Sequence, residues 1–189
     1  MKKLKQYIHS LTEFSRESWE LLLPALTEKE FKKGELLLEE GKVCKSLFYI
    51  NEGYCRSYYI KEGVEKNTAF YFEDEIVTNI QSFGSGEAST YAIIACEPVN
   101  AIVFDKNKLM EASRKNHEIE ALGRNCIRLF STRQQEFASI FQLYNPEERL
   151  LFIEKNHPEI LQRVSLTQLA SFLGVARETL SRIRKRRVT

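Results

Sequence analysis

Proline and glycine are scarce in this chain of 189 residues, which holds 4 Pro and 8 Gly. That scarcity excludes collagen-like and low-complexity material. Long apolar runs are also missing: Ala92–Cys96 is one of the longest, whereas a membrane-spanning helix needs roughly 20 apolar residues. The first nine residues are basic but lack the apolar stretch of a secretory signal. We therefore expect a folded protein that is located in the cytoplasm.

Cysteine and histidine are too few and too scattered for a metal centre. The 4 Cys stand at positions 44, 55, 96 and 126, and none of the 3 His lies close to another. This spacing suits neither a zinc site nor an iron–sulfur framework, so we expect no metal and no bound cofactor. We expect reduced thiols in or near a core. A redox pair of Cys44 and Cys55, facing each other across a hairpin, is the alternative.

Charged residues nearly balance, with a formal net charge of +2, but the basic excess lies at one end. Residues 145–189 carry a net charge of +4, which leaves −2 for the rest of the chain. The stretch Arg177–Arg187 alone holds six basic residues and one acid. A basic end on a balanced chain is typical of a module that binds a polyanion. A solvated helix end, where the helix dipole favours Lys and Arg, is the alternative.

Hydrophobic periodicity changes twice along the chain. Apolar residues recur at helical spacing through the first thirty residues and again beyond Lys106. Between these parts, short apolar stretches separated by turns predict strands. The strand candidates are Lys33–Gly41, Leu47–Ile50, Tyr54–Ile60, Asn67–Phe72, Ile76–Ile80, Tyr91–Cys96 and Asn100–Phe104. The pattern predicts an α+β chain: an antiparallel sandwich or barrel with lead helices over 1–105, a long helix over 106–144 and a helical domain over 145–189.

Two apolar stripes run along the predicted long helix. One stripe passes through Ile119, Leu122 and Leu129, and the other begins at Ile127 and Phe130. Two stripes on one helix indicate packing on two sides, against the chain's own sandwich and against a second chain. We place Leu122 and Leu129 in the seam between chains and expect a homodimer. Burial of the whole helix within one subunit is the alternative.

The most informative motif begins at Ser165. Ser165 followed by Gln168 has the form of a capping box, which starts a helix. Gly174 then supplies the left-handed backbone of a tight turn. Apolar residues on both sides of the turn are spaced for the inward faces of two crossing helices: Leu166, Leu169, Ala170, Leu173, Ala176, Leu180 and Ile183. This is the layout of a helix-turn-helix.

The outward face of the second helix carries side chains that suit DNA recognition. Its residues are Arg177, Glu178, Ser181, Arg182 and Lys185. Arg donates to guanine, Glu accepts from cytosine, and Ser can do either. We expect Arg177, Glu178 and Arg182 to face base edges, and Lys185, farther along, to contact phosphates. The predicted partner is double-stranded DNA with an inverted repeat, bound by a dimer.

With Gly174 followed by Arg177-Glu178-Thr179 and then Arg182, the sequence resembles the Crp/Fnr family of bacterial transcription regulators. The resemblance extends over nearly the whole chain and implies a cyclic-nucleotide-binding-like jelly roll, a dimerisation helix and a C-terminal DNA-binding domain. It implies base-edge contacts for Arg177, Glu178 and Arg182, and positions nearer the phosphates for Ser165 and Thr179. It also makes RNA polymerase and a small-molecule effector candidate partners.

The resemblance does not extend to the residues that hold cyclic AMP in this family. Members that bind cyclic AMP carry Phe-Gly-Glu-Leu and then Arg-Ser/Thr-Ala, whose Arg grips the cyclic phosphate. Here the two regions read Glu75-Ile76-Val77-Thr78-Asn79 and Ser89-Thr90-Tyr91. Without that Arg, a buried phosphate charge has no cationic partner. We expect no binding of cyclic AMP in the family manner and leave the effector open.

Two other classes of function compete with a DNA-binding regulator. Cupin enzymes also use a jelly roll, but their metal site needs two or three His on facing strands. His9, His117 and His157 lie outside the predicted strands, so we expect no enzyme. A cyclic-nucleotide or other small-ligand sensing module that acts through protein contacts is the remaining alternative, and the helix-turn-helix pattern disfavours it.

Overall fold

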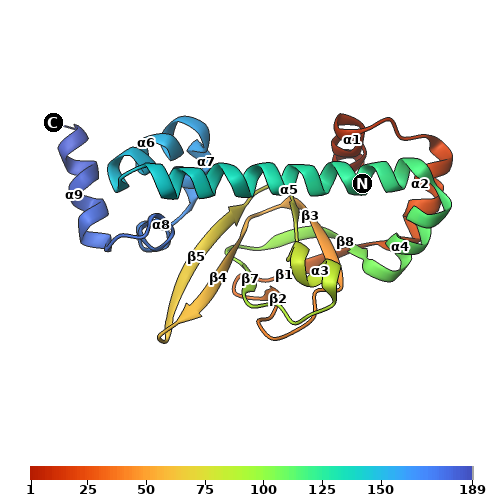
Figure 1. The fold of residues 1–189 in the computed structure, drawn as a ribbon, viewed down its shortest axis with the longest axis horizontal. Helices are drawn as coiled ribbons and strands as arrows, with labels where there is room; N and C mark the ends of the chain where they lie inside the picture. Colours follow the sequence, from red (N-terminus) through yellow and green to blue (C-terminus); the bar gives the residue numbers. More distant parts are fainter. Residues whose placement is uncertain (189) are drawn as a thin grey trace. The chain divides into compact units, whose positions relative to one another are not determined.

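The structure is a computed structural model that describes residues 1–188, with side chains described through Arg186. It consists of two compact units, shown in Figure 1. The first comprises residues 1–57 and 70–131, and the second comprises residues 58–69 and the residues from 132 onward. No helix within the described part of the chain is long and apolar enough to cross a membrane.

The first thirty residues form helices and a strand, whereas the periodicity predicted helices alone. The elements are α1 (Lys2–Leu11), α2 (Arg16–Leu22), the 3-10 turn η1 (Leu23–Ala25) and β1 (Leu26–Phe31). Ser15 starts α2, because its hydroxyl accepts a hydrogen bond from the backbone N–H of Ser18 at 3.2 Å. Leu26, which we expected on a helix, pairs with Phe104 in an antiparallel ladder. Strand pairing here overrides the local helical spacing.

The remaining strands build two packed sheets. They are β2 (Leu36–Leu38), β3 (Ser46–Glu52), β4 (Cys55–Lys61), β5 (Val64–Tyr71), β6 (Ile76–Val77), β7 (Ala92–Ala95) and β8 (Val99–Asp105). In the described chain the strand orders are β1-β8-β3-β6 and β2-β7-β4-β5, and β8 runs antiparallel to β1 and β3. This confirms the predicted antiparallel sandwich. Gly53, between β3 and β4, has φ +85°, and a Cβ there would lie 2.3 Å from the carbonyl oxygen of Pro98.

A short helix, α3 (Ile80–Ser85), follows β6 where the sequence pattern predicted a single strand over Ile76–Ile80. Asn79 accounts for the difference. Its side chain accepts a hydrogen bond from the backbone N–H of Ser82 at 3.1 Å and so starts a helix. Gly86 ends α3 with a left-handed φ of +79°.

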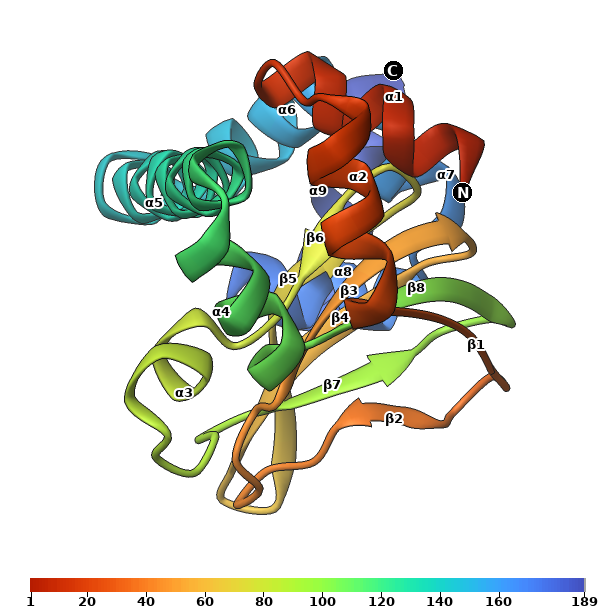
Figure 2. The same cartoon turned by 90° about the vertical axis from the view of Figure 1, so that its right-hand side faces the viewer.

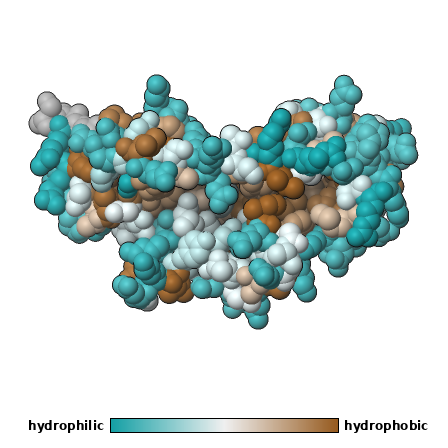
Figure 3. Space-filling view, in the orientation of Figure 1, coloured by the Kyte–Doolittle hydropathy of each residue, from teal (hydrophilic) through white to brown (hydrophobic). Residues whose placement is uncertain are grey.

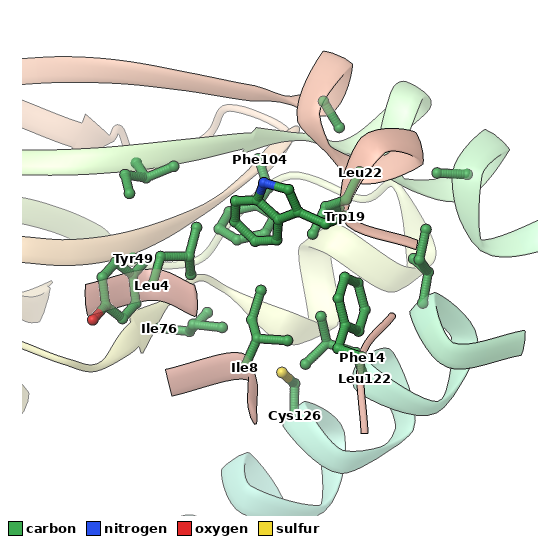
Figure 4. Close-up of a cluster of buried hydrophobic side chains, with 14 residues drawn as sticks. Leu4, Ile8, Phe14, Trp19, Leu22, Tyr49, Ile76, Phe104, Leu122 and Cys126 are labelled. Atoms are coloured by element: carbon green, nitrogen blue, oxygen red, sulfur yellow. The ribbon is translucent and has the colours of Figure 1, made fainter. Parts of the chain in front are cut away.

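Helices α4 (Lys106–Lys115) and α5 (His117–Leu143) follow β8. In the first unit, α1, α2 and α4 gather around the amino-terminal part of α5 (Figures 1 and 2). Side chains from these helices and from the sandwich form one buried cluster (Figure 4). Among its members are Leu4, Trp19, Tyr49, Phe104 and Leu122. This cluster joins the start of α5 to the sandwich.

Leu122 therefore belongs to the core of its own chain. It is 5% exposed, and its neighbours Ile119 and Cys126 on α5 are 1% and 8% exposed. The expected place of Leu122 in a seam between chains is wrong, because the helices that precede α5 already cover it. Other apolar residues of α5 stay open to solvent: Ile127 is 53% exposed and Leu129 is 42% exposed.

Short helices follow α5 in the second unit. They are α6 (Pro146–Asn156), α7 (Pro158–Arg163), α8 (Leu166–Leu173) and α9 (Arg177–Val188). Asn145 separates α5 from α6. Its side chain accepts hydrogen bonds from the N–H groups of Glu147 and Glu148, and the Glu148 carboxylate accepts from the Asn145 N–H at 2.8 Å. This capping box, with Pro146 at the first helical position, starts α6 directly after the long helix.

Candidate nucleic-acid interface

Helix α8 starts at Ser165, as the sequence predicted. The Ser165 hydroxyl accepts a hydrogen bond from the backbone N–H of Gln168 at 3.2 Å. The reciprocal bond, from the Ser165 N–H to the Gln168 side chain, is not formed among the described residues, so only half of the expected capping box is present. Leu169, Ala170 and Leu173 are all buried, which confirms the predicted inward face of α8.

The turn after α8 depends on Gly174, which has φ +74°. The Gly174 N–H bonds to the carbonyl oxygen of Ser171 at 3.3 Å, and the Val175 N–H bonds to that of Ala170 at 3.0 Å. These two bonds form a Schellman motif, in which the left-handed position favours glycine. The turn ends α8 sharply and lets α9 begin at Arg177.

Helix α9 presents the predicted site residues to solvent on its polar side. Those that are exposed are Arg177, Glu178, Arg182 and Lys185. Thr179 and Ser181 are half-buried, and the Thr179 hydroxyl accepts a hydrogen bond from Arg182 Nη2 at 3.3 Å. On the opposite side, Leu180 is fully buried and anchors the helix. Ser165 is exposed at the start of α8, before the turn that leads to these side chains.

Phe172 packs α8 against α5. Its ring makes edge-on contacts with the rings of Phe137 and Phe141, with 5.6 Å between ring centroids in each case. Phe172 is 4% exposed. Aromatic pairs of this geometry contribute about 0.5–1.5 kcal/mol beyond the burial of their area. The second apolar stripe of α5 is therefore covered by α8 at these positions, within a single chain.

Arg149 on α6 is a positioning residue that no local pattern in the sequence marked. Its Nη1 donates to the carbonyl oxygen of Leu173 at 3.1 Å, and its Nη2 donates to that of Phe141 at 2.8 Å. The guanidinium carbon lies 5.0 Å from the centroid of the Phe141 ring. Carbonyl groups at the end of a helix lack intrahelical partners and attract a cation. Arg149 thus holds the end of α8, and with it the turn before α9, against α5.

Comparisons with known proteins agree with this arrangement. Residues 28–116 match the family model of the cyclic nucleotide-binding domain. The chain is 27% identical over 172 residues to the fumarate and nitrate reduction regulatory protein of Escherichia coli, and the match covers 82% of this chain and 66% of that protein. FixK2 from Bradyrhizobium japonicum is similar in structure, with a TM-score of 0.67 and 18% identity over 85% of this chain and 83% of its own. These likenesses agree with the resemblance of the sequence to the Crp/Fnr family.

A further solved structure shares the fold of this chain over nearly its whole length. The c-di-GMP responsive global regulator CLP of Xanthomonas campestris has a TM-score of 0.71 and 15% identity, with 91% of each chain covered. The likeness confirms the predicted fold class, an antiparallel sandwich followed by a long helix and further helices. In sequence, the chain spans 66% of the length of the curated relatives that it matches.

By the resemblance to the Crp/Fnr family, residues 72–91 correspond to the segment that holds the phosphate in cyclic AMP binders. In this chain, hydrogen bonds within the segment close it. Asn79 Nδ2 donates to Ser89 Oγ at 2.8 Å, and the Ser89 hydroxyl donates to the carbonyl oxygen of Tyr91 at 2.6 Å. Asn79 and Ser89 are 4% and 2% exposed. Residues 72–91 contain four acidic residues and neither Lys nor Arg. A cyclic phosphate does not fit these residues, because its buried charge needs a cationic partner.

No disulfide joins the four cysteines, which all lie in the described part of the chain: Cys44, Cys55 and Cys126 are buried, and Cys96 is half-buried. Cys44 Sγ donates to the carbonyl oxygen of Ser46 at 3.3 Å and lies 3.2 Å from Thr78 Oγ1. Burial raises the pKa of the Cys126 thiol to about 11, which disfavours the reactive thiolate at neutral pH.

Proposed function

We propose that this chain is a transcription regulator of the Crp/Fnr type that binds double-stranded DNA sequence-specifically as a homodimer. One observation carries the proposal: α8, the Gly174 turn and α9 combine a buried inner face with an exposed basic helix. A helix presented in this way suits the major groove. The curated relatives are regulatory proteins by name, which supports a regulator rather than an enzyme.

In this proposal, Arg177, Glu178 and Arg182 contact base edges. All three are exposed in the first turns of α9, the part of a recognition helix that enters the major groove. Arg can donate two hydrogen bonds to guanine, and Glu can accept one from cytosine. Ser181 lies beside Arg182 and adds a neutral donor or acceptor. This group carries the sequence preference.

The remaining candidate residues position α9 on the DNA backbone. Lys185 is exposed farther along α9, and Ser165 is exposed where α8 begins. Thr179 holds Arg182 through its hydroxyl and lies nearer the phosphates in this proposal. Phosphate contacts orient a protein on the duplex and carry no direct sequence information.

We assign dimerisation to one stripe of α5. Glu120, Gly123 and Ile127 are three and four positions apart and so share a face of the helix. Ile127 is 53% exposed, and a Cβ on Gly123 would meet no heavy atom within 4 Å. An exposed apolar side chain next to open space over a glycine allows a second helix to approach closely.

The effector in this proposal is not cyclic AMP held in the family manner. The hydrogen bond between Asn79 and Ser89 and the absence of Lys and Arg from residues 72–91 support this. RNA polymerase is a candidate protein partner because the sequence resembles the Crp/Fnr family of transcription regulators.

Selection of binding sites from random DNA duplexes tests the proposed function. The wild-type chain should select an inverted repeat with half-site centres roughly 34–36 Å apart, which is one helical turn. Arg182→Ala should relax the preference at one position of each half-site by about 1–3 kcal/mol. Arg186→Ala, at an exposed position, should weaken all sequences equally and reduce the salt slope by about one per subunit. Binding that is indifferent to both sequence and salt would contradict the proposal.

A further inference from the structure

An apolar cavity of about 420 Å³ lies in the first unit between the sandwich and helices α3, α4 and α5. Its lining includes Phe83 and Gly84 from α3, Leu109 and Met110 from α4, and Ile127 from α5. Apolar surface is visible in the hollow between α5 and α3 in Figure 3. The volume is within the range of roughly 300–1,000 Å³ that is typical of small-molecule sites.

The cavity contains one cation that has no carboxylate partner. Lys106 Nζ donates to the main-chain carbonyl oxygen of Phe83 and lies 5.2 Å from the centroid of the Phe83 ring. Across the described residues, Lys106 forms no ion pair. The other charged residues of the lining, Glu120 and Arg124, are paired with each other. The cavity wall thus carries a net charge of +1, located at Lys106.

Two glycines in the wall leave space that side chains of this chain do not fill. A Cβ on Gly84 or Gly123 would meet no heavy atom within 4 Å in the described structure. Both residues lie in helices without a positive φ, so a left-handed backbone does not account for them. A glycine inside a helix costs about 1 kcal/mol relative to alanine. At Gly84 the missing side chain leaves the cavity open, whereas the space over Gly123 adjoins the stripe that we assign to the dimer.

We propose that the cavity binds a small monocarboxylate with an apolar body of about ten carbon atoms, matched to its volume. The carboxylate would pair with Lys106, because in an apolar surrounding an ion pair with a carboxylate is stronger than a hydrogen bond from the ammonium group to a neutral carbonyl oxygen. The apolar body would pack on Phe83 and Leu109. Such a ligand contacts α3, α4 and α5 together, and its use as an effector rests on the proposed function.

A second copy of the chain is the competing occupant of this space. A second copy that packs on the stripe assigned to the dimer would bring its own Glu120 to the cavity. The carboxylate of that residue is already paired with Arg124 of the same chain. The assigned stripe therefore offers Lys106 no unpaired carboxylate. This charge is the reason for assigning the cavity to an anionic ligand.

Calorimetric titration of the full chain without DNA tests the site. The probes are decanoate, decanol and decyltrimethylammonium, each below its micelle concentration. Decanoate should bind at one site per chain and more tightly than decanol, and the cationic probe should bind least. Lys106→Met should weaken decanoate about tenfold and leave decanol unchanged. Lys108→Met, an exposed lysine on the same helix, is the matched control and should change neither affinity.

Gly84→Leu tests the location, since the new side chain should fill the cavity and abolish the binding of decanoate and decanol. Circular dichroism and thermal unfolding test whether this variant folds. If it does not fold, the comparison of Lys106→Met with Lys108→Met decides alone.

Three results would overturn the proposal: no decanoate binding to the wild type, equal affinity of Lys106→Met and the wild type for decanoate, or binding that survives Gly84→Leu. Binding to a monomeric Ile127→Glu variant but not to the wild type would also overturn it, because a second copy would then cover the cavity. No DNA is present, so the selection of binding sites tests the proposed function separately.

Discussion

The backbone N–H of Asn67 on β5 donates a hydrogen bond to the hydroxyl of Ser171 on α8, at 3.1 Å. The same hydroxyl donates to the carbonyl oxygen of Glu65 at 3.1 Å. Ser171 thus occupies the edge of β5 in the way that a further strand would. Asn67 Nδ2 adds a bond to the carbonyl oxygen of Gln168 at 3.0 Å. Within the second unit, the strand segment and the helix-turn-helix are joined by these bonds.

Ser171→Ala should lower the free energy of unfolding of the second unit by about 1–2 kcal/mol. The substitution removes the acceptor for the Asn67 N–H, and Asn67 is only 7% exposed. Hydrogen exchange of the α8 amides measures the effect locally. Thr167→Ala, an exposed position on the same helix, is the control and should change stability by no more than about 0.5 kcal/mol. Equal effects of the two variants would show that the contact with β5 contributes nothing.

Arg149→Met should destabilise the second unit by about 2 kcal/mol, because it removes two hydrogen bonds from a charged donor. The end of α8 and the turn at Gly174 should then exchange faster with solvent. DNA affinity should fall even though Arg149 does not lie on α9. Arg149→Lys should recover part of the loss, because an ammonium group reaches one carbonyl group more readily than both. Unchanged exchange around Gly174 in Arg149→Met would contradict the positioning role.

Gly174→Ala and Gly123→Ala should shift stability in opposite directions. Gly174 has φ +74°, and a left-handed backbone costs about 1–2 kcal/mol for a residue with a Cβ. Gly123 lies inside α5 with open space at its Cβ position, and alanine there should stabilise the helix by up to about 1 kcal/mol. Urea unfolding followed by circular dichroism measures both. A neutral Gly174→Ala would show that the turn relaxes without its Schellman bonds.

Glu118 should make stability depend on pH in the acid range. Hydrogen bonds from the Ser15 N–H and the Ser18 hydroxyl lower the pKa of Glu118 to about 2. Because the pKa of Glu118 is lower in the folded than in the unfolded state, the contribution of Glu118 to stability is fully present above the unfolded pKa of about 4.3. It is lost as the pH falls toward 2. Glu118→Gln should therefore be less stable than the wild type at neutral pH.

The difference between Glu118→Gln and the wild type should shrink between about pH 4.3 and pH 2. Fluorescence of Trp19, the single tryptophan of the chain, reports unfolding of the first unit. Glu17→Gln, an exposed carboxylate on α2, controls for the loss of one surface charge. A difference in the free energy of unfolding between Glu118→Gln and the wild type that stays constant down to pH 2 would argue against this role of Glu118.

Ile127→Glu should dissociate the proposed dimer, because it places a charge on the stripe that contains Gly123. Leu129→Glu is the matched control: Leu129 is also an exposed apolar residue of α5, at 42% against 53% for Ile127, but lies two positions away and so on another face. Sedimentation velocity should show a monomer for Ile127→Glu and a dimer for Leu129→Glu. Dissociation by Leu129→Glu alone would move the interface to the face on which we first expected it.

Local features of this protein could be predicted from the sequence because they depend on neighbouring residues. Ser165 as the start of α8 and Gly174 as the turn after it are set by backbone geometry over a few positions. The alternation of turns and short apolar stretches likewise predicted the sandwich. The positions of Arg177 and Arg182 on the exposed side of α9 follow from helical spacing around Leu180.

Other features depend on contacts between residues that are far apart in the chain, and only the tertiary structure decided them. Leu122 and Ile127 look alike in the sequence, but α1, α2 and α4 cover the side of α5 that carries Leu122 and leave Ile127 exposed. Arg149 meets the ends of two other helices, and Asn67 meets a helix about a hundred positions later. Periodicity shows that a helix or strand has an apolar face and a polar face. It does not show which element packs there, because that choice depends on how the whole chain folds back on itself.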